Sequence, residues 1–511
     1  MFRSLFSFLL AALPVAPVAH AAPPDKGLGI NIHTVSYWAP TLPFTDMFKQ
    51  AGNWVPQRAG SQAWNTGEAL DIDADGWIRT LTPGQQAATV VMTGGRYPAG
   101  RYLVAYEGEG ELFFGLDGKI VSKRGKDLLV EVTPKNSVIL KIMKTNPANP
   151  IRDIRMYPPG FNPAKCNTPF NREYLDYLDG FKVIRFMDWA NTNLDDTVDW
   201  FDRTRPQHAT QSRNSGVAVE HMIELAEETG AHPWFNLPHA ASDKYVREMA
   251  WLLKEKLAPD GKFYIEYSNE VWNTQFPQYA HMVKSAARLG ISNPDDYYVR
   301  RSVEIFRIFE EVFGDTSRFV RVLGGQAVHT WRAGKLLANP NISRSVDAYA
   351  IAPYFGHQAQ LDTTGALNTK NTSTEEFMRR LDKSLVETRE VIRANQALAK
   401  KAGVALIAYE AGQHVTNPPG NDEFCASLNR HQKMGELYSK YLDIWDQETA
   451  SALMVVFADM SNYGRSGCWG LSEYYGQDLS AAPKLQSIRR YQTQKKRAVM
   501  PSRTRRLHCT S

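Results

Sequence analysis

Short apolar runs alternate with amphipathic stretches along most of the chain, and this alternation predicts repeated strand–helix units. Apolar runs with the length of buried strands stand at 27–35, 181–186, 232–237, 263–267, 319–324, 346–354, 404–409 and 452–457. Amphipathic stretches such as 242–257 and 434–445 separate several of them, and Ser373 opens a capping box before a long helix expected to end near Gly403. Strands that alternate with helices predict a parallel sheet, and eight such units are typical of a (β/α)8 barrel.

The pattern changes between about Asn65 and Pro158, where short alternating runs are separated by Gly, Asp and Pro residues. Residues 102–106, 128–132 and 138–142 are examples of these runs. Strands at this spacing are typical of an all-β sandwich. Because the region falls between the first two apolar runs, we expect a sandwich inserted after the first barrel strand, where barrel loops accept large additions.

At 511 residues the chain is too long for one simple core, and a barrel with an accessory domain accounts better for its length. The predicted fold class is therefore α/β, a (β/α)8 TIM barrel with an inserted all-β sandwich domain. The predicted segments are a signal peptide at 1–21, the first barrel strand and loop at 22–64, the inserted sandwich at 65–158, the remainder of the barrel at 159–494 and a basic tail at 495–511.

The first residues predict export. A basic residue at Arg3, an apolar stretch at 5–13 and the small-x-small sequence at 19–21 together resemble a signal peptide. A membrane anchor is the alternative, but the stretch is far shorter than about 20 residues, and Pro14 and Pro17 interrupt it. No later stretch approaches spanning length. We therefore expect a secreted or periplasmic protein without stable membrane insertion.

The formal net charge is +5, and the carboxyl-terminal tail accounts for it. Six positive charges come from Lys495, Lys496, Arg497, Arg503, Arg505 and Arg506. The body of the protein is therefore near neutral. We expect the tail to be solvated and expect no nucleic-acid partner. The oligomeric state stays open.

The cysteine spacing argues against a zinc cluster or a redox motif. The four cysteines, Cys166, Cys425, Cys468 and Cys509, show no C-x-x-C spacing. In an oxidising compartment they can pair. Cys425 and Cys468 follow two successive predicted strands, so both are expected on loops at the same barrel face. A disulfide between them and a pair of free buried thiols are the two alternatives.

Two glutamates carry the candidate chemistry. Glu270 follows the apolar run at 263–267, and Glu410 follows the run at 404–409, 140 positions later. This separation leaves room for about three strand–helix units of 30 or more residues each. Functional groups of a (β/α)8 barrel stand at the carboxyl ends of different strands. Two carboxylates delivered in this way can cut a glycosidic bond, whereas exposed carboxylates in structural ion pairs are the alternative.

The Asn269–Glu270 pair after the fourth strand, with Glu410 after the seventh, resembles the clan A retaining glycoside hydrolases, a superfamily of cellulase- and mannanase-like (β/α)8 enzymes. The resemblance covers the first strand and about 181–478, and leaves out the sandwich and the tail. It implies that Glu270 is the acid/base, that Glu410 is the nucleophile and that Asn269 holds the 2-hydroxyl of the sugar. These roles require a protonated Glu270, with a pKa raised by burial or a nearby negative charge, and an ionised Glu410.

Further residues are implied by the same resemblance. Arg185 ends the second strand, where a cation would keep Glu410 ionised; a salt bridge at the barrel mouth is its alternative role. Tyr354 matches a tyrosine that hydrogen-bonds the nucleophile, with apolar packing as its alternative. Trp469 matches an aromatic platform for the sugar at the cleavage site. His239 follows the third strand and either contacts a sugar hydroxyl or is an ordinary loop histidine.

One position departs from the superfamily pattern. Many members have a histidine two positions before the tyrosine of the sixth strand, and this chain has Ala352 there. His357 and His329 are the candidates to replace it.

The sequence predicts no cofactor and no metal. Residues 71–76 imitate the start of a calcium loop, but the twelfth position is Thr82 rather than a bidentate Glu, which favours a turn between sandwich strands. No H-E-x-x-H pattern, Gly-rich phosphate loop or G-x-S-x-G sequence is present.

Together these patterns predict a secreted retaining β-glycoside hydrolase that acts on a poly- or oligosaccharide by double displacement. A non-catalytic glycan-binding protein on a barrel scaffold is one alternative. A transglycosylase in exopolysaccharide assembly, which would use the same carboxylates but exclude water, is another.

Overall fold

A computed structural model describes residues 22–166, 168–360, 372–417, 423–464 and 467–496. The predicted signal peptide, Cys509 and all but the first two residues of the predicted basic tail lie outside this range.

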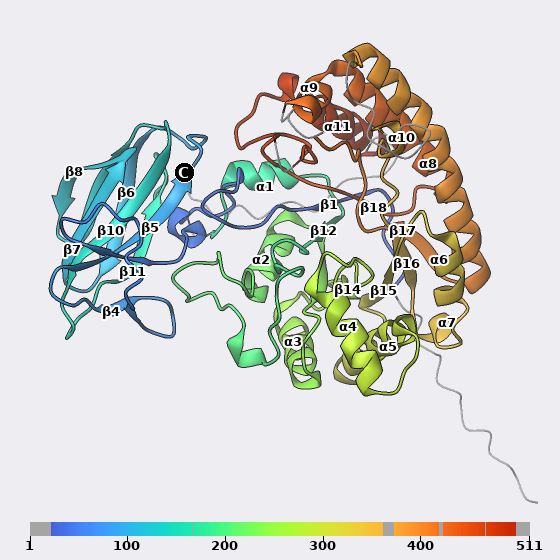
Figure 1. The fold of residues 1–511 in the computed structure, drawn as a ribbon, viewed down its shortest axis with the longest axis horizontal. Coiled ribbons are helices and arrows are strands. Elements are labelled where there is room, and N and C mark those ends of the chain that lie inside the picture. Colours follow the sequence, from blue (N-terminus) through green and yellow to red (C-terminus); the bar gives the residue numbers. More distant parts are fainter. Residues whose placement is uncertain (1–21, 167, 361–371, 418–422, 465–466, 497–511) are drawn as a thin grey trace, which may run out of the picture.

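Eight parallel strands close into a barrel in chain order (Figure 1). They are β1 (Leu28–Asn31), β12 (Val183–Arg185), β13 (His232–Leu237), β14 (Phe263–Tyr267), β15 (Phe319–Gly325), β16 (Ala348–Ile351), β17 (Ala405–Ala408) and β18 (Met454–Val456). The barrel closes where Ile30 of β1 pairs with Ile184 of β12 on one side and with Val456 of β18 on the other. The predicted (β/α)8 barrel is confirmed.

The helices lie outside the barrel, where they cover the outward side chains of the strands (Figure 1). They are α1 (Arg172–Leu178), α2 (Val219–Thr229), α3 (Asp243–Lys256), α4 (Pro277–Arg288), α5 (Pro294–Phe313), α6 (Thr330–Leu337), α7 (Ile342–Ser345), α8 (Thr374–Ala402), α9 (Phe424–Arg430), α10 (Gln432–Thr449) and α11 (Pro483–Lys496). The predicted capping box is present, because the Ser373 side chain accepts a hydrogen bond from the Glu376 amide. Gly403, with φ 74°, ends α8. Within the described ranges, each helix is too short or too polar to cross a membrane.

Two antiparallel sheets form the inserted sandwich, which stands beside the barrel in Figure 1. One sheet has the order β2 (Val55–Arg58), β5 (Gln85–Thr93), β10 (Ser137–Thr145) and β7 (Gly110–Leu116). The other has the order β11 (Arg152–Tyr157), β6 (Gly100–Glu107), β9 (Asp127–Val132) and β8 (Gly118–Arg124). Alternate side chains from both sheets make a buried core separate from that of the barrel. The strand β2 precedes residue 65, where the sequence predicts the sandwich to begin. The sequence did not reveal this strand, because a Pro-containing run of four residues shows no clear alternation.

The acidic segment at 71–76 forms a turn between two short strands, β3 (Asp71–Ile72) and β4 (Ile78–Thr80). The Asp73 carboxylate accepts hydrogen bonds from the amides of Asp75 and Trp77. Asp71 pairs with Arg79 on the opposite strand. The local partners of both aspartates agree with the turn that the sequence favours.

Candidate active site

Side chains along a strand alternate between the barrel interior and the surrounding helices, and this alternation builds the site. On β12, Val183 belongs to the buried group inside the barrel, and Ile184 belongs to the core shared with the helices. Arg185 follows the parity of Val183 and therefore points inward. On β14, Glu266 follows the parity of the interior residue Tyr264 in the same way. Strand periodicity thus places a cation and a carboxylate together inside the barrel.

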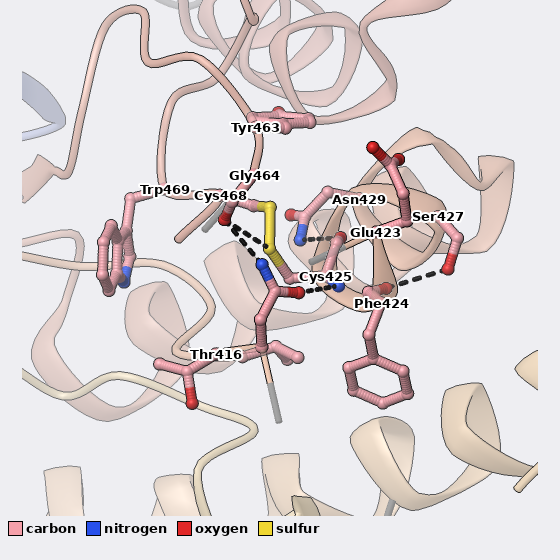
Figure 2. Close-up of a disulfide and its surroundings, with 12 residues drawn as sticks. Thr416, Glu423, Phe424, Cys425, Ser427, Asn429, Tyr463, Gly464, Cys468 and Trp469 are labelled. Carbon is pink, nitrogen blue, oxygen red and sulfur yellow. Dashed lines mark hydrogen bonds between the residues drawn. A yellow bond between two sulfur atoms is a disulfide. The ribbon is translucent and has the colours of Figure 1, made fainter. Parts of the chain in front are cut away.

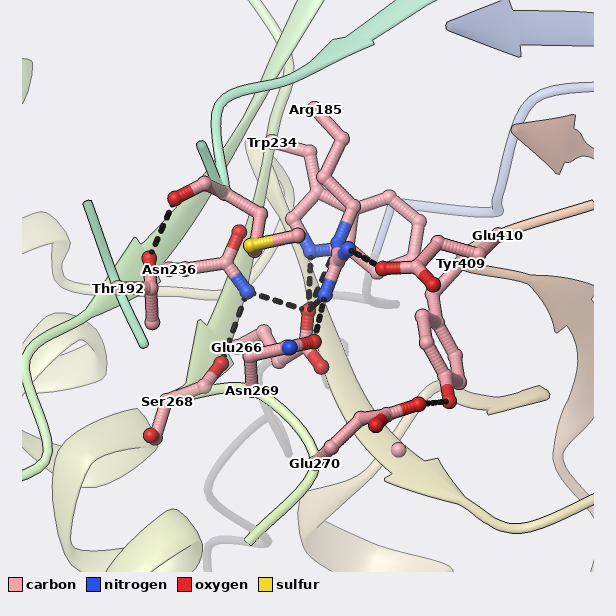
Figure 3. A network of polar contacts seen from close by, with 12 residues as sticks. Arg185, Thr192, Trp234, Asn236, Glu266, Ser268, Asn269, Glu270, Tyr409 and Glu410 are labelled. Atoms are coloured by element: carbon pink, nitrogen blue, oxygen red, sulfur yellow. Dashed lines mark hydrogen bonds and ion pairs between the residues drawn. The ribbon is translucent and has the colours of Figure 1, made fainter. Parts of the chain in front are cut away.

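Arg185 has no exposed surface, and all five of its N–H groups meet acceptors (Figure 3). Its Nε and Nη2 donate to Glu266 Oε2 over 3.2 and 3.0 Å. The second N–H of Nη2 donates to Asn269 Oδ1 over 2.8 Å. Nη1 donates to Asn31 Oδ1 over 3.2 Å and to Glu410 Oε1 over 3.1 Å. One guanidinium therefore fixes groups delivered by β1, β14 and β17.

Glu266 is the main acceptor for that guanidinium. Besides the two Arg185 donors, Trp234 Nε1 at 2.9 Å and Asn236 Nδ2 at 2.8 Å also donate to its Oε2. Gly324 on β15 leaves space for the other oxygen, because a Cβ at this position would lie 3.1 Å from Glu266 Oε1. Sequence reasoning gave Glu266 no role in the site.

Glu410 lies directly beyond β17 and is held at both oxygens. Oε1 accepts the Arg185 hydrogen bond, and Oε2 accepts one from the Tyr354 hydroxyl over 3.0 Å. The residue is 7% exposed. The structure therefore brings Arg185, Tyr354 and Glu410 together.

Glu270 lies beyond β14 and is more exposed than Glu410. Its Oε1 accepts a hydrogen bond from the Tyr409 hydroxyl over 2.7 Å, and its Oε2 accepts one from Asn273 Nδ2 over 3.0 Å. Ser268 and Glu270 have φ of 58° and 37°, in the left-handed region that side chains other than glycine rarely adopt. Such strained backbone is concentrated at functional sites in proteins.

Tyr409 connects the two glutamates. Its hydroxyl bonds Glu270, and the next residue in the chain is Glu410, so the tyrosine side chain lies between the two carboxylates in Figure 3. The Arg185 guanidinium lies 5.0 Å from the centre of the Tyr409 ring. Sequence reasoning missed Tyr409, although its parity on β17 points it into the barrel with Ile407.

Burial raises the pKa of Glu410 to about 8. Arg185 and the Tyr354 hydrogen bond oppose this rise, and the negative charges of Glu270 and Asp188 add to it. The sequence predicts that Arg185 favours the ionised form of Glu410. The Arg185 charge does not offset the burial of Glu410, and Arg185 is also paired with a second buried carboxylate, Glu266.

Asn269 is fixed at both ends of its amide. Its Oδ1 accepts from Arg185, and its Nδ2 donates to Asn193 Oδ1 over 3.1 Å. The Asn193 oxygen also accepts from Gln278 Nε2 over 2.8 Å. The amide nitrogen has a second N–H, and its direction is set by these contacts.

A group of aromatic and histidine rings continues from the Glu410 side of the site. The His414 ring lies 5.3 Å from that of Tyr354 and 5.8 Å from that of Trp469, whose Nε1 is 3.4 Å from His414 Nδ1. His357 stands 5.6 Å from His414, whereas His329 is exposed at the start of α6. Of the two histidines proposed to replace the one missing at Ala352, only His357 joins this group. His414 was missed, and its place four residues after Glu410 was the available signal.

His239 lies in a different environment from these rings. It is 5% exposed, and its ring is 5.1 Å from that of His281. Burial lowers the pKa of His239 to about 4, and the positive charge of His281 acts in the same direction. The structure does not bring His239 into contact with either glutamate within the residues it describes.

A disulfide anchors the loop that carries Trp469 (Figure 2). Cys425 and Cys468 are bonded, which decides between the two alternatives left by the sequence. Cys425 belongs to α9 rather than to a loop. The Cys468 carbonyl also accepts from Gln413 Nε2 over 2.9 Å and from the buried Lys484 Nζ over 2.7 Å. Cys166 is disulfide-bonded as well.

Other hollows in the surface offer less chemistry. One of about 640 Å³, along η4 (Leu479–Ala481) and α11, has no carboxylate among the described residues that line it. Another of about 350 Å³ contains Asp195, Asp196 and Asp202 beside Arg213. Within the described parts of the chain, no three His, Cys, Asp or Glu side chains are grouped so that they could hold a metal ion. The two glutamates at the barrel mouth are therefore the better candidate.

No protein-family model matches the sequence, and no curated protein matches it. Solved structures of similar shape include a GH51 arabinofuranosidase from Xanthomonas axonopodis pv. citri, with 13% identity, a TM-score of 0.45, and coverage of 64% of this chain and 67% of that one. A GH5-4 broad-specificity endoglucanase from Clostridium longisporum has 12% identity, a TM-score of 0.41, and coverage of 64% and 87%. An endo-β-1,4-mannanase of glycoside hydrolase family 26 from Cellulomonas fimi has 13% identity, a TM-score of 0.35, and coverage of 61% and 63%. Since these TM-scores are below 0.5, the fold assignment rests on the closed barrel itself.

Proposed function

We propose that the protein is a retaining β-glycoside hydrolase that acts on a poly- or oligosaccharide. The observation that carries this proposal is the pairing of Glu270 and Glu410 through Tyr409, at the carboxyl ends of β14 and β17. Catalytic groups of (β/α)8 enzymes come from the ends of different strands. We also propose export, on the basic, apolar and small-residue pattern of residues 1–21.

In the first step, an ionised Glu410 attacks the anomeric carbon while Glu270 donates a proton to the departing glycosidic oxygen. The bond to the leaving sugar breaks, and an ester forms between the remaining sugar and Glu410. The Arg185 and Tyr354 hydrogen bonds support this role, because they orient the Glu410 carboxylate from both sides.

In the second step, Glu270, now ionised, takes a proton from water, and the oxygen of that water attacks the anomeric carbon. Glu410 leaves as a carboxylate, and the sugar keeps its β configuration. Asn269 is proposed to donate to the 2-hydroxyl of the sugar through Nδ2. Its contact with Arg185 supports this, since the oxygen end of the amide is already occupied.

Trp469 and the neighbouring rings of His414 and Tyr354 are proposed to contact the sugar. The apolar faces of pyranose rings pack on aromatic side chains, and the ring nitrogens can bond hydroxyls. His239 follows β13, and its buried Nδ1 has no hydrogen-bond partner among the described residues, so we also propose that it contacts a sugar hydroxyl.

The test is hydrolysis of a panel of plant, fungal and bacterial β-glycans, measured as new reducing ends. A mechanism-based fluoroglycoside should then label Glu410, and NMR of the first product should show the β anomer. Glycan binding without turnover would refute the proposal in favour of a binding protein. Transfer to an added acceptor sugar without release to water would instead indicate a transglycosylase.

A further inference from the structure

Arg185 is a single cation paired with two buried carboxylates, and it donates a different number of hydrogen bonds to each. Glu266 accepts hydrogen bonds from two of the five Arg185 N–H groups, both at Oε2, whereas Glu410 accepts a hydrogen bond from one. Glu266 is 2% exposed and has no other positively charged partner in the described structure. The charge of Glu266 therefore serves to hold the Arg185 guanidinium and does not bind another charged group at the barrel mouth.

The Glu266 anchor is itself rigid. Trp234 and Asn236, two residues apart on β13, donate to the same oxygen that binds Arg185. Asn236 also donates to the Ser268 carbonyl over 2.8 Å, just before Asn269. Burial raises the pKa of Glu266, whereas the four donors on its Oε2 oppose this rise and favour the ionised form. The position of this oxygen therefore fixes the plane and the reach of the Arg185 guanidinium.

The groups that depend on Arg185 are those assigned to the reaction. One Nη2 N–H orients Asn269, and one Nη1 N–H holds Glu410. We infer that Glu266 is a positioning residue, which fixes Arg185 between Asn269 and Glu410 and limits how far the Arg185 charge neutralises Glu410. This inference rests on the proposed function for its kinetic consequence, but its electrostatic consequence can be measured without a substrate.

The effect of removing the Glu266 charge on the ionisation of Glu410 depends on the charged and titratable groups around both carboxylates. Glu410 faces Arg185, Tyr354, Glu270 and Asp188, and Tyr409 lies beside it. Glu266 faces Arg185 and, from α5, Tyr298. Removing the negative charge of Glu266 leaves Glu410 as the only carboxylate paired with Arg185, so the ionised form of Glu410 gains stability.

The kinetic test is Glu266→Gln, which keeps the size of the side chain and removes its charge. The acid limb of the kcat/KM profile should move to lower pH by about one unit or more, which is about a tenfold gain at the foot of the limb relative to the optimum. Trp234→Phe is the matched control, because it removes one donor to Oε2 and leaves the charge in place. Its acid limb should stay within about 0.2 units of the wild type. An unmoved limb in Glu266→Gln, or an equal shift in both variants, would overturn the inference.

A substrate-free measurement covers the cases in which Glu266→Gln does not fold or no β-glycan is cleaved. The wild-type protein, labelled with ¹³C at the glutamate carboxyls, is titrated by NMR. Glu410→Gln identifies the Glu410 signal, and Trp234→Phe shifts that of Glu266. Glu266 should remain ionised at the pH at which Glu410 binds its proton. Protonation of Glu266 at the higher pH would disprove the inference, whereas failure of the glycan panel alone would count only against the proposed function.

Discussion

The Tyr409 hydroxyl donates a hydrogen bond to Glu270 Oε1 over 2.7 Å, although the two residues are 139 positions apart in the chain. The bond joins the ends of β14 and β17 across the barrel mouth. It orients the proposed acid/base from the same strand that delivers the proposed nucleophile.

Tyr409→Phe should therefore lower kcat/KM on an oligosaccharide about tenfold, because a hydrogen bond to a carboxyl group contributes about 1.5 kcal/mol. The loss should be smaller on an aryl glycoside whose leaving group needs little protonation. Tyr349→Phe is a matched control, since the buried Tyr349 hydroxyl has no hydrogen-bond partner within the part of the chain that the structure describes. Equal losses in both variants would show that the Tyr409 hydrogen bond has no specific role.

Alanine at the two glutamates should have unequal effects. Glu410→Ala should abolish turnover of every substrate, because no covalent intermediate can form. Glu270→Ala should retain turnover of aryl glycosides with activated leaving groups while losing that of natural glycans. Comparison of both variants on one activated and one natural substrate tests the assignment. Equal residual activity on the activated substrate would contradict it.

The pH profile should reflect the burial of Glu410. Its pKa is raised to about 8, and the attacking form is the ionised one. Activity should therefore rise with pH through the neutral range, about tenfold per unit well below pH 8, and level off above it. The measurement is kcat/KM between pH 5 and about 9.5 on an aryl glycoside whose leaving group needs little protonation, so that ionisation of Glu270 does not limit the rate. A profile that is already flat at pH 6 would contradict this expectation.

The barrel could be predicted from the sequence because residues adjacent in the chain specify each of its strands and helices. Each strand is an apolar run that can be recognised by itself, and Ser373 and Gly403 mark the ends of α8 through their immediate neighbours. The Asn269–Glu270 pair and Glu410 could be proposed as site residues in the same way, since each follows a strand. Such features need only a few adjacent residues.

The contacts that organise the site depend instead on tertiary structure. Glu266 and Tyr409 are both interior strand residues, and nothing in their local sequence shows that one binds Arg185 and the other binds Glu270. The direction of the Glu410 pKa was also out of reach. It depends first on the burial of the carboxyl group and then on its charged neighbours, above all Arg185 and Glu270, which only the three-dimensional arrangement defines.

The raised pKa of Glu410 has a consequence for stability. The folded protein holds a proton on Glu410 up to about pH 8, whereas the unfolded chain releases it near the ordinary value of 4.5. The folded state therefore binds more protons between these values, and its stability falls as the pH rises through this window. Glu410→Gln, which cannot ionise, should raise the Tm at pH 8.5 by more than at pH 4.5. Calorimetry at both values measures this, and an equal change at both would contradict it.

The Cys425–Cys468 disulfide closes a loop of 43 residues that includes the approach to Trp469. Replacing both cysteines with serine should lower the free energy of unfolding by up to about 4 kcal/mol, from the loop-closure entropy. KM for an oligosaccharide should also rise several-fold with little change in kcat. Trp469 would lose one tether of its loop, whereas Arg185 and Tyr354 would still hold Glu410. Trp469→Ala, alone and combined with the double serine variant, provides the control, because two changes acting on the same contact should not add. A fall in kcat at constant KM, or strictly additive effects, would show that the disulfide does not act through Trp469.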